Sequence, residues 1–389
     1  MTDRTPSPWL AAGALILLAF NLRLIFPSLS VVLPEIVQST GISISTAGYL
    51  TTLPMLCLGL FAPMAPLCVR HFGIERTLVA ALVLLTVGTG IRGIHGLTGL
   101  FVGSILSGAC IAISNVLLPI LVKRDFSSSM ALVTGLYVTS MNLGSAAAAA
   151  FTVPVMTFWN TGWQTGLALW SLPTAIIALV WLPRLRIRSS ASVIPHTPAT
   201  IWKDPLAWQI TVYMGLQSSM AYTVLGWMAP ILQSRGLDAT AAGIITSACI
   251  VANLVGNLVA PALIKRAADQ RLLTALLALG CGTALIGLLF APPMWLWPLS
   301  LVLGFAQGAT FATALTIIVL RSRTTAAATS LSGMAQSVGY TIGAFAPLAI
   351  GLIHHWTGSY TPIAWLLSII TLGASLSGWM AGRNRYVLD

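Results

Sequence analysis

One arginine lies inside the first long apolar stretch of the chain, LILLAFNLRLIFPSLS, residues 15–30. A helix rises roughly 21 Å from Trp9 to Arg23, which places the guanidinium past the middle of a hydrocarbon layer about 30 Å thick. A charge facing lipid at that depth would cost on the order of 3 kcal/mol, and arginine cannot lose its proton to avoid this cost. Arg23 must therefore face protein, water or an anion.

No acidic residue is placed to pair with Arg23 within an apolar stretch. The 8 Asp and Glu residues and the 5 His residues all fall at the ends of such stretches or between them. Glu35, the nearest acid that follows, is three helical turns away and is expected at the outer surface. An unpaired cation at this depth predicts a binding site for an anionic or strongly dipolar substrate. The alternative is that Arg23 extends to lipid phosphates, or caps backbone carbonyls at a helix break near Pro27.

The same residue types argue against other kinds of chemistry. No intramembrane group of His, Cys, Asp and Glu could hold a metal or carry out acid–base or nucleophilic catalysis. The 5 cysteines fall in apolar segments without metal-ligand spacing. We therefore expect no cofactor, no metal and no enzymatic activity. Without a buried carboxylate to exchange protons, we expect facilitated diffusion, exchange, or symport of an anion with a proton.

The composition indicates a membrane protein. Of its 389 residues, 57% are hydrophobic and only 7% are charged, which is too little polar surface for a soluble globule of this size. The net charge of +11 is concentrated in short loops between apolar spans, where basic residues orient a chain in the bilayer rather than bind nucleic acid. The expected partners are the lipid bilayer and a small-molecule substrate.

Apolar runs long enough to cross the membrane predict twelve helices in an all-α fold. They cover residues 9–33, 43–68, 76–94, 97–121, 130–154, 163–182, 206–232, 240–264, 272–291, 294–320, 326–353 and 361–381. With the N-terminus in the cytoplasm, sixteen Lys and Arg residues fall inside and only Arg92 and Arg235 fall in outer loops. The positive-inside rule therefore places both termini in the cytoplasm.

A polar segment after the sixth span divides the chain into two halves. We predict an N-terminal six-helix half at 1–182, a cytoplasmic linker at 183–205 and a C-terminal six-helix half at 206–389. A shift of 195 to 198 residues brings VKRDF (122–126) near LRSRT (320–324) and aligns the basic loops after the second and eighth spans. Two pseudo-symmetric halves of this kind place a substrate site between them, near the middle of the bilayer.

These features resemble the major facilitator superfamily of secondary transporters. The loop RHFGIER (70–76) resembles part of that family's signature between helices 2 and 3, although Arg70 takes the place of its aspartate. The stretches NLR (21–23), LTTLP (50–54) and above all NVLLPILVKRDF (115–126) are similar to the bacterial branch of cyanate and 2-nitroimidazole transporters. The resemblance implies a monomer in the bacterial inner membrane that moves a small anionic or strongly polar solute by alternating access.

The resemblance also selects candidate residues on the helices that line the cavity in this family. With Arg23, the candidate substrate-binding residues are neutral and polar or aromatic: Asn21, Tyr49, Asn115, Tyr137, Asn142, Gln217, Tyr222, Trp227, Gln307, Gln336 and Tyr340. Each could instead serve only a helix–helix hydrogen bond. The candidate gating residues are charged: Arg70, Glu75, Arg76, Lys123, Arg124 and Asp125. Two other functions stay open, an exporter of neutral or cationic drug-like compounds and a scaffold that kept the fold without transport.

Overall fold

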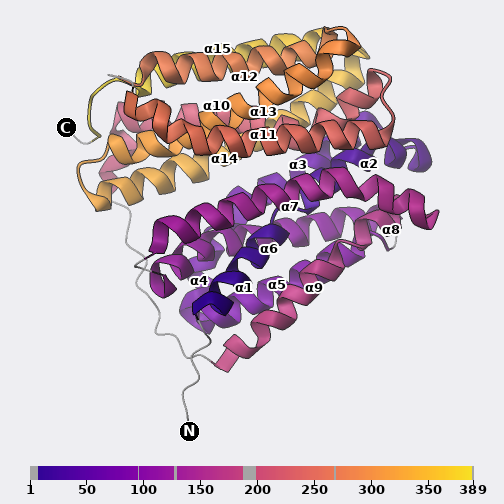
Figure 1. Ribbon diagram of the computed structural model, residues 1–389, viewed down its shortest axis with the longest axis horizontal. Helices are drawn as coiled ribbons and strands as arrows, with labels where there is room; N and C mark the ends of the chain where they lie inside the picture. Colours follow the sequence, from indigo (N-terminus) through magenta and orange to yellow (C-terminus); the bar gives the residue numbers. More distant parts are fainter. Residues whose placement is uncertain (1–7, 95, 127–128, 187–198, 267–268, 388–389) are drawn as a thin grey trace.

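The computed structural model describes residues 8–94, 96–126, 129–186, 199–266 and 269–387, and its regular structure over these ranges is entirely helical. Figure 1 shows two groups of helices side by side. The first group contains α1 (Pro8–Asn21), α2 (Ile25–Thr40), α3 (Ile44–Phe61), α4 (Met64–Phe72), α5 (Ile74–Ile91), α6 (Gly96–Asp125), α7 (Met130–Trp159), α8 (Trp163–Ala168) and α9 (Ser171–Trp181). The second contains α10 (Pro205–Ser234), α11 (Ala239–Arg266), α12 (Arg271–Phe290), α13 (Leu296–Leu320), α14 (Thr325–Thr357) and α15 (Thr361–Ala381).

Eleven segments of these ranges are long and apolar enough to cross a membrane. The twelfth predicted span corresponds to α10, whose 30 residues would reach roughly 45 Å. Glutamine, serine and threonine residues lower the hydropathy of α10, and most of its length is buried against α2, α14 and α15. A helix shielded from lipid in this way can carry polar groups toward an internal site. The all-α membrane fold is thus confirmed.

Three predicted spans are each interrupted four residues before a proline. The first is split into α1 and α2 at Leu22–Leu24, and the second into α3 and α4 at Ala62–Pro63. The sixth is split into α8 and α9 at Leu169–Trp170. A proline ring clashes with the carbonyl four residues earlier and offers it no N–H. Pro27, Pro66 and Pro173 therefore place these interruptions.

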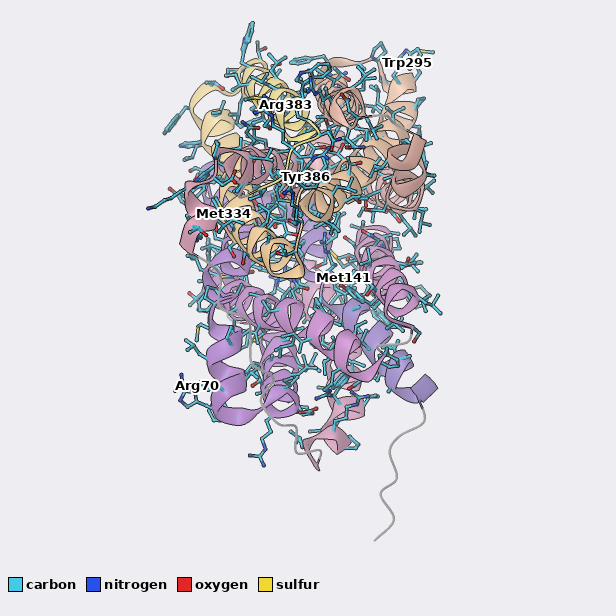
Figure 2. The ribbon with its side chains drawn as sticks, turned by 90° about the vertical axis from the view of Figure 1, so that its left-hand side faces the viewer. Arg70, Met141, Trp295, Met334, Arg383 and Tyr386 are labelled. Atoms are coloured by element: carbon cyan, nitrogen blue, oxygen red, sulfur yellow. The ribbon has the colours of Figure 1, made fainter. Side chains whose placement is uncertain are left out.

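Hydrophobic packing joins the two groups of helices mainly at one end. One buried core runs from α2, α3 and α7 through to α10, α11 and α14. Two other cores belong mainly to one group each, and the second of these includes the end of α15. In Figure 1 the two groups lie closest at the end away from the chain termini and diverge toward the termini. Figure 2, turned by 90°, places Met141 on α7 and Met334 on α14 where the groups face each other.

Glycines allow the close approach at the joined end. A Cβ added to Gly351 of α14 would lie 2.7 Å from the Cα of Gly48 on α3. Three other contacts cross between the groups at this end: the Ser30 hydroxyl donates to the Gly226 carbonyl at 3.0 Å, Gln233 donates to the Val31 carbonyl at 3.0 Å, and Gly243 packs on the Ala149 carbonyl. We call this set of contacts the outer seal.

We expect Gly351→Val to loosen the outer seal, because overpacking of this kind costs about 1–3 kcal/mol. The added side chain strains only the closed conformation, so the open conformation should become about tenfold more populated. Thiol labelling of a Val31→Cys reporter should then rise by a similar factor. Gly333→Val on the same helix is the control, because no atom lies within 4 Å of an added Cβ there. Equal labelling in both variants would contradict the expected role of Gly351.

Candidate functional site

Arg23 lies in the interruption between α1 and α2. In a continuous helix the Arg23 carbonyl would accept a hydrogen bond from residue 27, but Pro27 has no N–H. At the end of α1 the chain makes a tight turn, in which the Leu22 N–H donates to the Ala19 carbonyl at 3.2 Å. The next helix restarts immediately afterwards, at Ile25. Pro27 has no N–H and the Ser28 N–H donates to the Leu24 carbonyl at 3.3 Å, so the start of α2 offers the N–H groups of Ile25 and Phe26 on the side of Arg23, where the helix dipole adds positive potential.

Two tyrosines of the second group of helices lie within electrostatic range of Arg23. Its guanidinium interacts with the phenols of Tyr222 on α10 and Tyr340 on α14, both of the second group of helices. The rings of Tyr222 and Tyr340 are tilted at 58° with centroids 6.3 Å apart. Tyr340 also interacts with Tyr137 on α7. We call Arg23, Tyr137, Tyr222 and Tyr340 the central cluster; it draws on both groups of helices.

Within the described ranges, the partly buried Arg23 makes no hydrogen bond and no ion pair. The acids in these ranges lie at helix ends, as predicted. Glu35, which is exposed, accepts a hydrogen bond from the Trp163 N–H at 3.1 Å. Asp238 caps the start of α11 by accepting from the Ala241 N–H at 2.9 Å. The charge of Arg23 is thus not neutralised by a carboxylate from this part of the chain.

Four of the predicted amide and indole residues already form hydrogen bonds. Asn21 donates to the Leu17 carbonyl at 2.8 Å, and its Oδ1 is buried without a partner in the described chain. Gln217 donates to the Ser218 hydroxyl at 2.8 Å and likewise leaves its Oε1 unpaired. Gln336 accepts from the Tyr340 hydroxyl at 3.4 Å, which extends the central cluster along α14. Trp227 donates to the Pro347 carbonyl at 3.0 Å and so links α10 to α14.

The remaining predicted binding residues are spread over several helices. Tyr49 on α3 is 47% exposed. Asn142 on α7 donates to the Val138 carbonyl at 3.1 Å. Asn115 on α6 is partly buried and Gln307 on α13 is buried. The structure shows no hydrogen bond from any of these four to a member of the central cluster, among the residues that it describes.

The predicted gating residues divide into a paired set and an exposed set. Glu75, which is 2% exposed, accepts a hydrogen bond from Arg124, and Asp125 binds both Arg124 and Arg184. Burial alone would lower the pKa of Arg124, but its hydrogen bonds to Asp125 and Glu75 outweigh this and raise the pKa. The exposed set is Arg70 and Arg76; for Lys123 only its position in α6 is described. Figure 2 shows Arg70 at the far side of the first group of helices.

The second group of helices repeats this pairing with a neutral partner. Arg321 follows α13 as Arg124 ends α6, and it donates to Gln270 at the start of α12 as Arg124 does to Glu75 at the start of α5. Arg321 also donates to the Gly382 carbonyl at 2.9 Å. Its burial lowers its pKa, because the cation loses solvent. The internal repeat is therefore visible in the side-chain contacts.

This repeat gives a prediction for Glu75. Because the second group uses glutamine for the same bond, Glu75→Gln should change the stability by less than about 1 kcal/mol. Glu75→Leu removes the acceptor and should cost about 1–3 kcal/mol, an amount reduced by the partial exposure of Arg124. Thermal unfolding of the two variants beside the wild type measures this difference. A glutamine variant as unstable as the leucine variant would show that the charge, not the hydrogen bond, matters.

Arg92, which the charge count assigns to the outer side of the membrane, is buried. It follows α5, is 1% exposed, and donates from Nη2 to the Ile25 carbonyl at 3.1 Å. The count of charges gave no indication of this burial, because a positive charge at a helix end can fold back into the bundle as readily as outward. The signal that could have found it is the glycine spacing of the facing helix, where Gly103 packs directly on Arg92.

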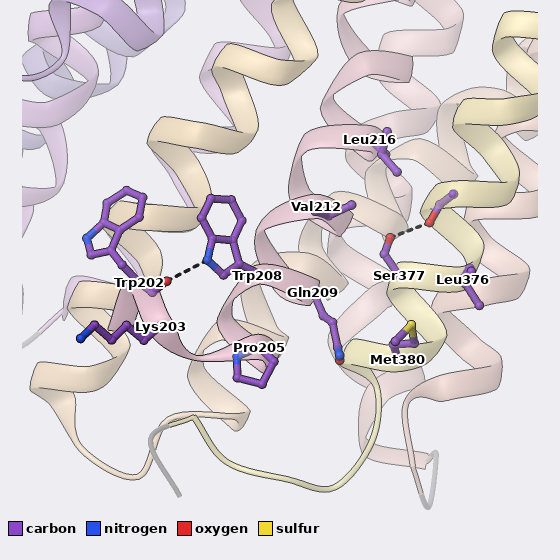
Figure 3. A pocket seen from close by; sticks show the side chains of 11 residues that line it. Trp202, Lys203, Pro205, Trp208, Gln209, Val212, Leu216, Leu376, Ser377 and Met380 are labelled. Atoms are coloured by element: carbon purple, nitrogen blue, oxygen red, sulfur yellow. Dashed lines mark hydrogen bonds between the residues drawn. The ribbon is translucent and has the colours of Figure 1, made fainter. Parts of the chain in front are cut away.

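A groove of about 670 Å³ lies away from the central cluster, on the flank of the second group of helices (Figure 3). It opens beside Trp202 and Trp208, and the Trp208 indole donates to the Trp202 carbonyl at 2.9 Å. Its other lining residues are mostly apolar: Lys203, Pro205, Gln209, Val212, Leu216, Gly373, Leu376, Ser377 and Met380. None of them is a predicted substrate-binding residue, so this groove is a separate feature.

Comparison with known proteins identifies the family. Residues 11–344 match the Major Facilitator Superfamily. The chain is 37% identical to the uncharacterized transporter YycB of Bacillus subtilis, over 98% of this chain and 95% of that one. It is 36% identical to the 2-nitroimidazole transporter of Escherichia coli, with 97% and 96% covered, and 28% identical to the cyanate transport protein CynX of Escherichia coli, with 89% and 90% covered.

Solved structures show the same fold at low sequence identity. The nucleoside transporter NupG superposes with a TM-score of 0.78 at 12% identity, covering 96% of this chain and all of that one. The family match and the two relatives above 30% identity, each aligned over nearly the full chain, show the family. The chain is therefore a multi-pass membrane transporter that belongs to the major facilitator superfamily.

Proposed function

We propose that this transporter carries a small anionic or strongly polar solute across the bacterial cytoplasmic membrane by alternating access, with Arg23 as the charge that binds it. The observation that carries the proposal is the central cluster: a guanidinium of the first group of helices, with no carboxylate partner in the described chain, within electrostatic range of two phenols of the second group. A buried cation gains most from a ligand that supplies the missing negative charge.

The local geometry supports an anion rather than a cation. The broken helix directs the N–H groups of α2 toward Arg23, an arrangement that interrupted membrane helices use to bind anionic groups. The phenols of Tyr137, Tyr222 and Tyr340 can donate hydrogen bonds without adding charge. Asn21 and Gln217 provide amides close in sequence to Arg23 and Tyr222. A compact ligand could therefore meet one charge and several neutral donors.

The names of two relatives fit this chemistry. One relative transports 2-nitroimidazole, whose nitro group makes it strongly dipolar, and the other is a cyanate transport protein, whose ligand is a small anion. Both ligands are compact and expose oxygen or nitrogen acceptors, which a guanidinium can meet with two parallel hydrogen bonds. We propose a solute of the same size and polarity for this chain.

The packing of the two groups supports alternating access. The outer seal closes one end, whereas each group has its own core at the end that holds the termini. With both termini in the cytoplasm, this arrangement is an inward-facing state. Closure at the inner end would bring the ends of α6 and α13, which carry Arg124 and Arg321, toward each other. Glu75 and Asp125 hold Arg124 in place for that step.

A ligand screen by thermal unfolding tests the proposal. Purified protein should be stabilised by cyanate-sized anions and nitro-heterocycles, since any ligand that binds the folded state raises its stability. Bulky cations at matched ionic strength are the control. Stabilisation only by the cations would favour an exporter of drug-like compounds, and stabilisation by no compound of either class, with no flux into liposomes, would favour a scaffold.

The positions of the acids give a prediction on energy coupling. The described acids all lie at helix ends, so no described carboxylate is placed to carry a proton through the central cluster. Counterflow of an anion that does not titrate near neutral pH should therefore change by less than about twofold between pH 6 and 8. An imposed pH gradient should not drive its accumulation in liposomes. Clear proton-driven accumulation of such an anion would contradict this prediction.

A further inference from the structure

A second cation is buried within the first group of helices, apart from the central cluster. Arg92 is 1% exposed, and only its Nη2 has a partner in the described chain, the Ile25 carbonyl at 3.1 Å. Its Nε and Nη1 are buried without a hydrogen-bond partner there, and no described carboxylate pairs with it. Glu35, further along α2, is engaged by the Trp163 N–H. Arg92 therefore brings a charge and two unused donor groups into the protein interior.

Unpaired hydroxyls lie on the same three helices as the contacts of Arg92. Thr89 is one helical turn before Arg92 on α5, and Ser28 is one turn after Ile25 on α2. On α6, Ser104 follows Gly103, which packs on Arg92, and Ser107 lies one turn further on. All four residues are fully buried, and their hydroxyls have no hydrogen-bond partner in the described chain.

The helices α5 and α6 pack closely around these groups, and Arg92 joins α2 to them by a hydrogen bond. A Cβ added to Gly103 would lie 2.8 Å from Cγ of Arg92, and a Cβ added to Gly88 would lie 2.7 Å from the Ser107 hydroxyl. The bond from Arg92 to the Ile25 carbonyl ties α5 to α2. The cation and the hydroxyls therefore belong to one region of the interior rather than to separate surfaces.

The chemistry of this region is that of an anion site. A guanidinium can only donate hydrogen bonds, and it is charged at neutral pH. Hydroxyls can donate as well, so the region offers donors from three helices and no negative charge. Water would satisfy the donors but would leave the charge uncompensated in a low dielectric, which is costly. A small anion would satisfy both.

We propose that Arg92 holds a small monovalent anion, chloride in ordinary buffers, through Nε and Nη1, with hydroxyls of Ser28, Thr89 and Ser104 as further donors. This resident anion is distinct from the transported solute, and the proposal does not depend on the function assigned to Arg23. Because Arg92 also binds the carbonyl of Ile25, the first residue of α2, the anion would hold the guanidinium that fixes the start of this helix.

Chloride dependence of the unfolding temperature tests the proposal. Wild-type protein in gluconate buffer should gain about 3 °C or more as chloride or bromide replaces gluconate at constant ionic strength, with saturation. Arg92→Met should abolish this dependence, whereas Arg23→Gln should keep it. An unfolding temperature of the wild type that is the same in gluconate and chloride would overturn the proposal, as would an unchanged response in Arg92→Met.

A crystallographic measurement on the wild type covers the case in which Arg92→Met does not fold. Crystals grown or soaked in bromide should show an anomalous peak within hydrogen-bond reach of Nε and Nη1 of Arg92. Density there that fits water alone, with no anomalous signal, would refute the site. An anomalous peak at Arg23 only would refute it as well, while agreeing with the proposed substrate site.

Discussion

Replacing Arg23 with glutamine is expected to weaken the binding of a small anion by about 100-fold or more. Hydrogen bonds to a charged group contribute about 1.5–3 kcal/mol each, and a guanidinium can make two of them to one anion. Each 1.4 kcal/mol corresponds to a tenfold change in affinity. Glutamine keeps a donor of similar reach but loses the charge. The measurement is the dissociation constant for cyanate or nitrate by calorimetry, with liposome uptake in parallel.

Two control variants separate the local effect from a general one. Arg271→Gln removes the same charge from the start of α12, where Arg271 is partly buried and its Nε lies 3.5 Å from Asp269, and should leave the affinity unchanged. Arg23→Lys keeps the charge without the planar pair of donors and should recover part of the affinity. An anion that binds Arg23→Gln as tightly as the wild type would show that Arg23 serves the helix interruption or the membrane surface instead.

The phenols should contribute less than the charge. Tyr222→Phe or Tyr340→Phe removes one neutral hydrogen bond, which corresponds to about 0.5–1.5 kcal/mol, or roughly a tenfold loss of affinity at most. The ring contact between Tyr222 and Tyr340 is retained in either variant. The same calorimetric titration measures both. A loss as large as that of Arg23→Gln would mean that the phenols, rather than the guanidinium, dominate binding.

Most of the fold could be predicted from the sequence, because membrane spans need long apolar runs and those are visible without a structure. The helix interruptions were less visible. Hydropathy shows one continuous span from residue 9 to residue 33, yet α1 ends at Asn21 and Pro27 favours the interruption at residues 22–24. The sequence suggested a break near Pro27 only as the alternative to substrate binding. A break does not exclude the proposed ligand role, since Arg23 itself lies in the interruption.

The candidate site could be predicted in part. Arg23 stood out because its cost in lipid is large, and the tyrosines followed from family resemblance, which put them on cavity-lining helices. The sequence could not show which tyrosines come within electrostatic range of Arg23. The helices α7, α10 and α14 meet only when the two groups of helices pack together. The sequence also gave no sign that Arg92 is buried, since a count of charges at helix ends does not show which way the side chains fold.

The interruption at Arg23 leads to the second large expected effect. Pro27→Ala restores an N–H for the Arg23 carbonyl and removes the ring that clashes with it. A helix that continues through residues 22–24 would gain about 1–3 kcal/mol, part of the roughly 3 kcal/mol that proline costs within a helix. The continuous helix would also withdraw the free N–H groups of α2 and turn the Arg23 side chain away from the phenols. We expect the unfolding temperature to rise while the anion affinity and uptake fall tenfold or more.

Pro34→Ala is the matched control, because Pro34 lies within α2 where the helix runs on without interruption. It makes the same chemical change in the same span and should alter the stability without altering the affinity. Suppose that both variants gain stability and only Pro27→Ala loses binding. Pro27 then lowers the stability of the protein but is needed because the interrupted helix directs Arg23 toward its ligand. If Pro27→Ala binds and transports as the wild type does, the interruption has no part in recognition, and the guanidinium reaches its ligand from a continuous helix.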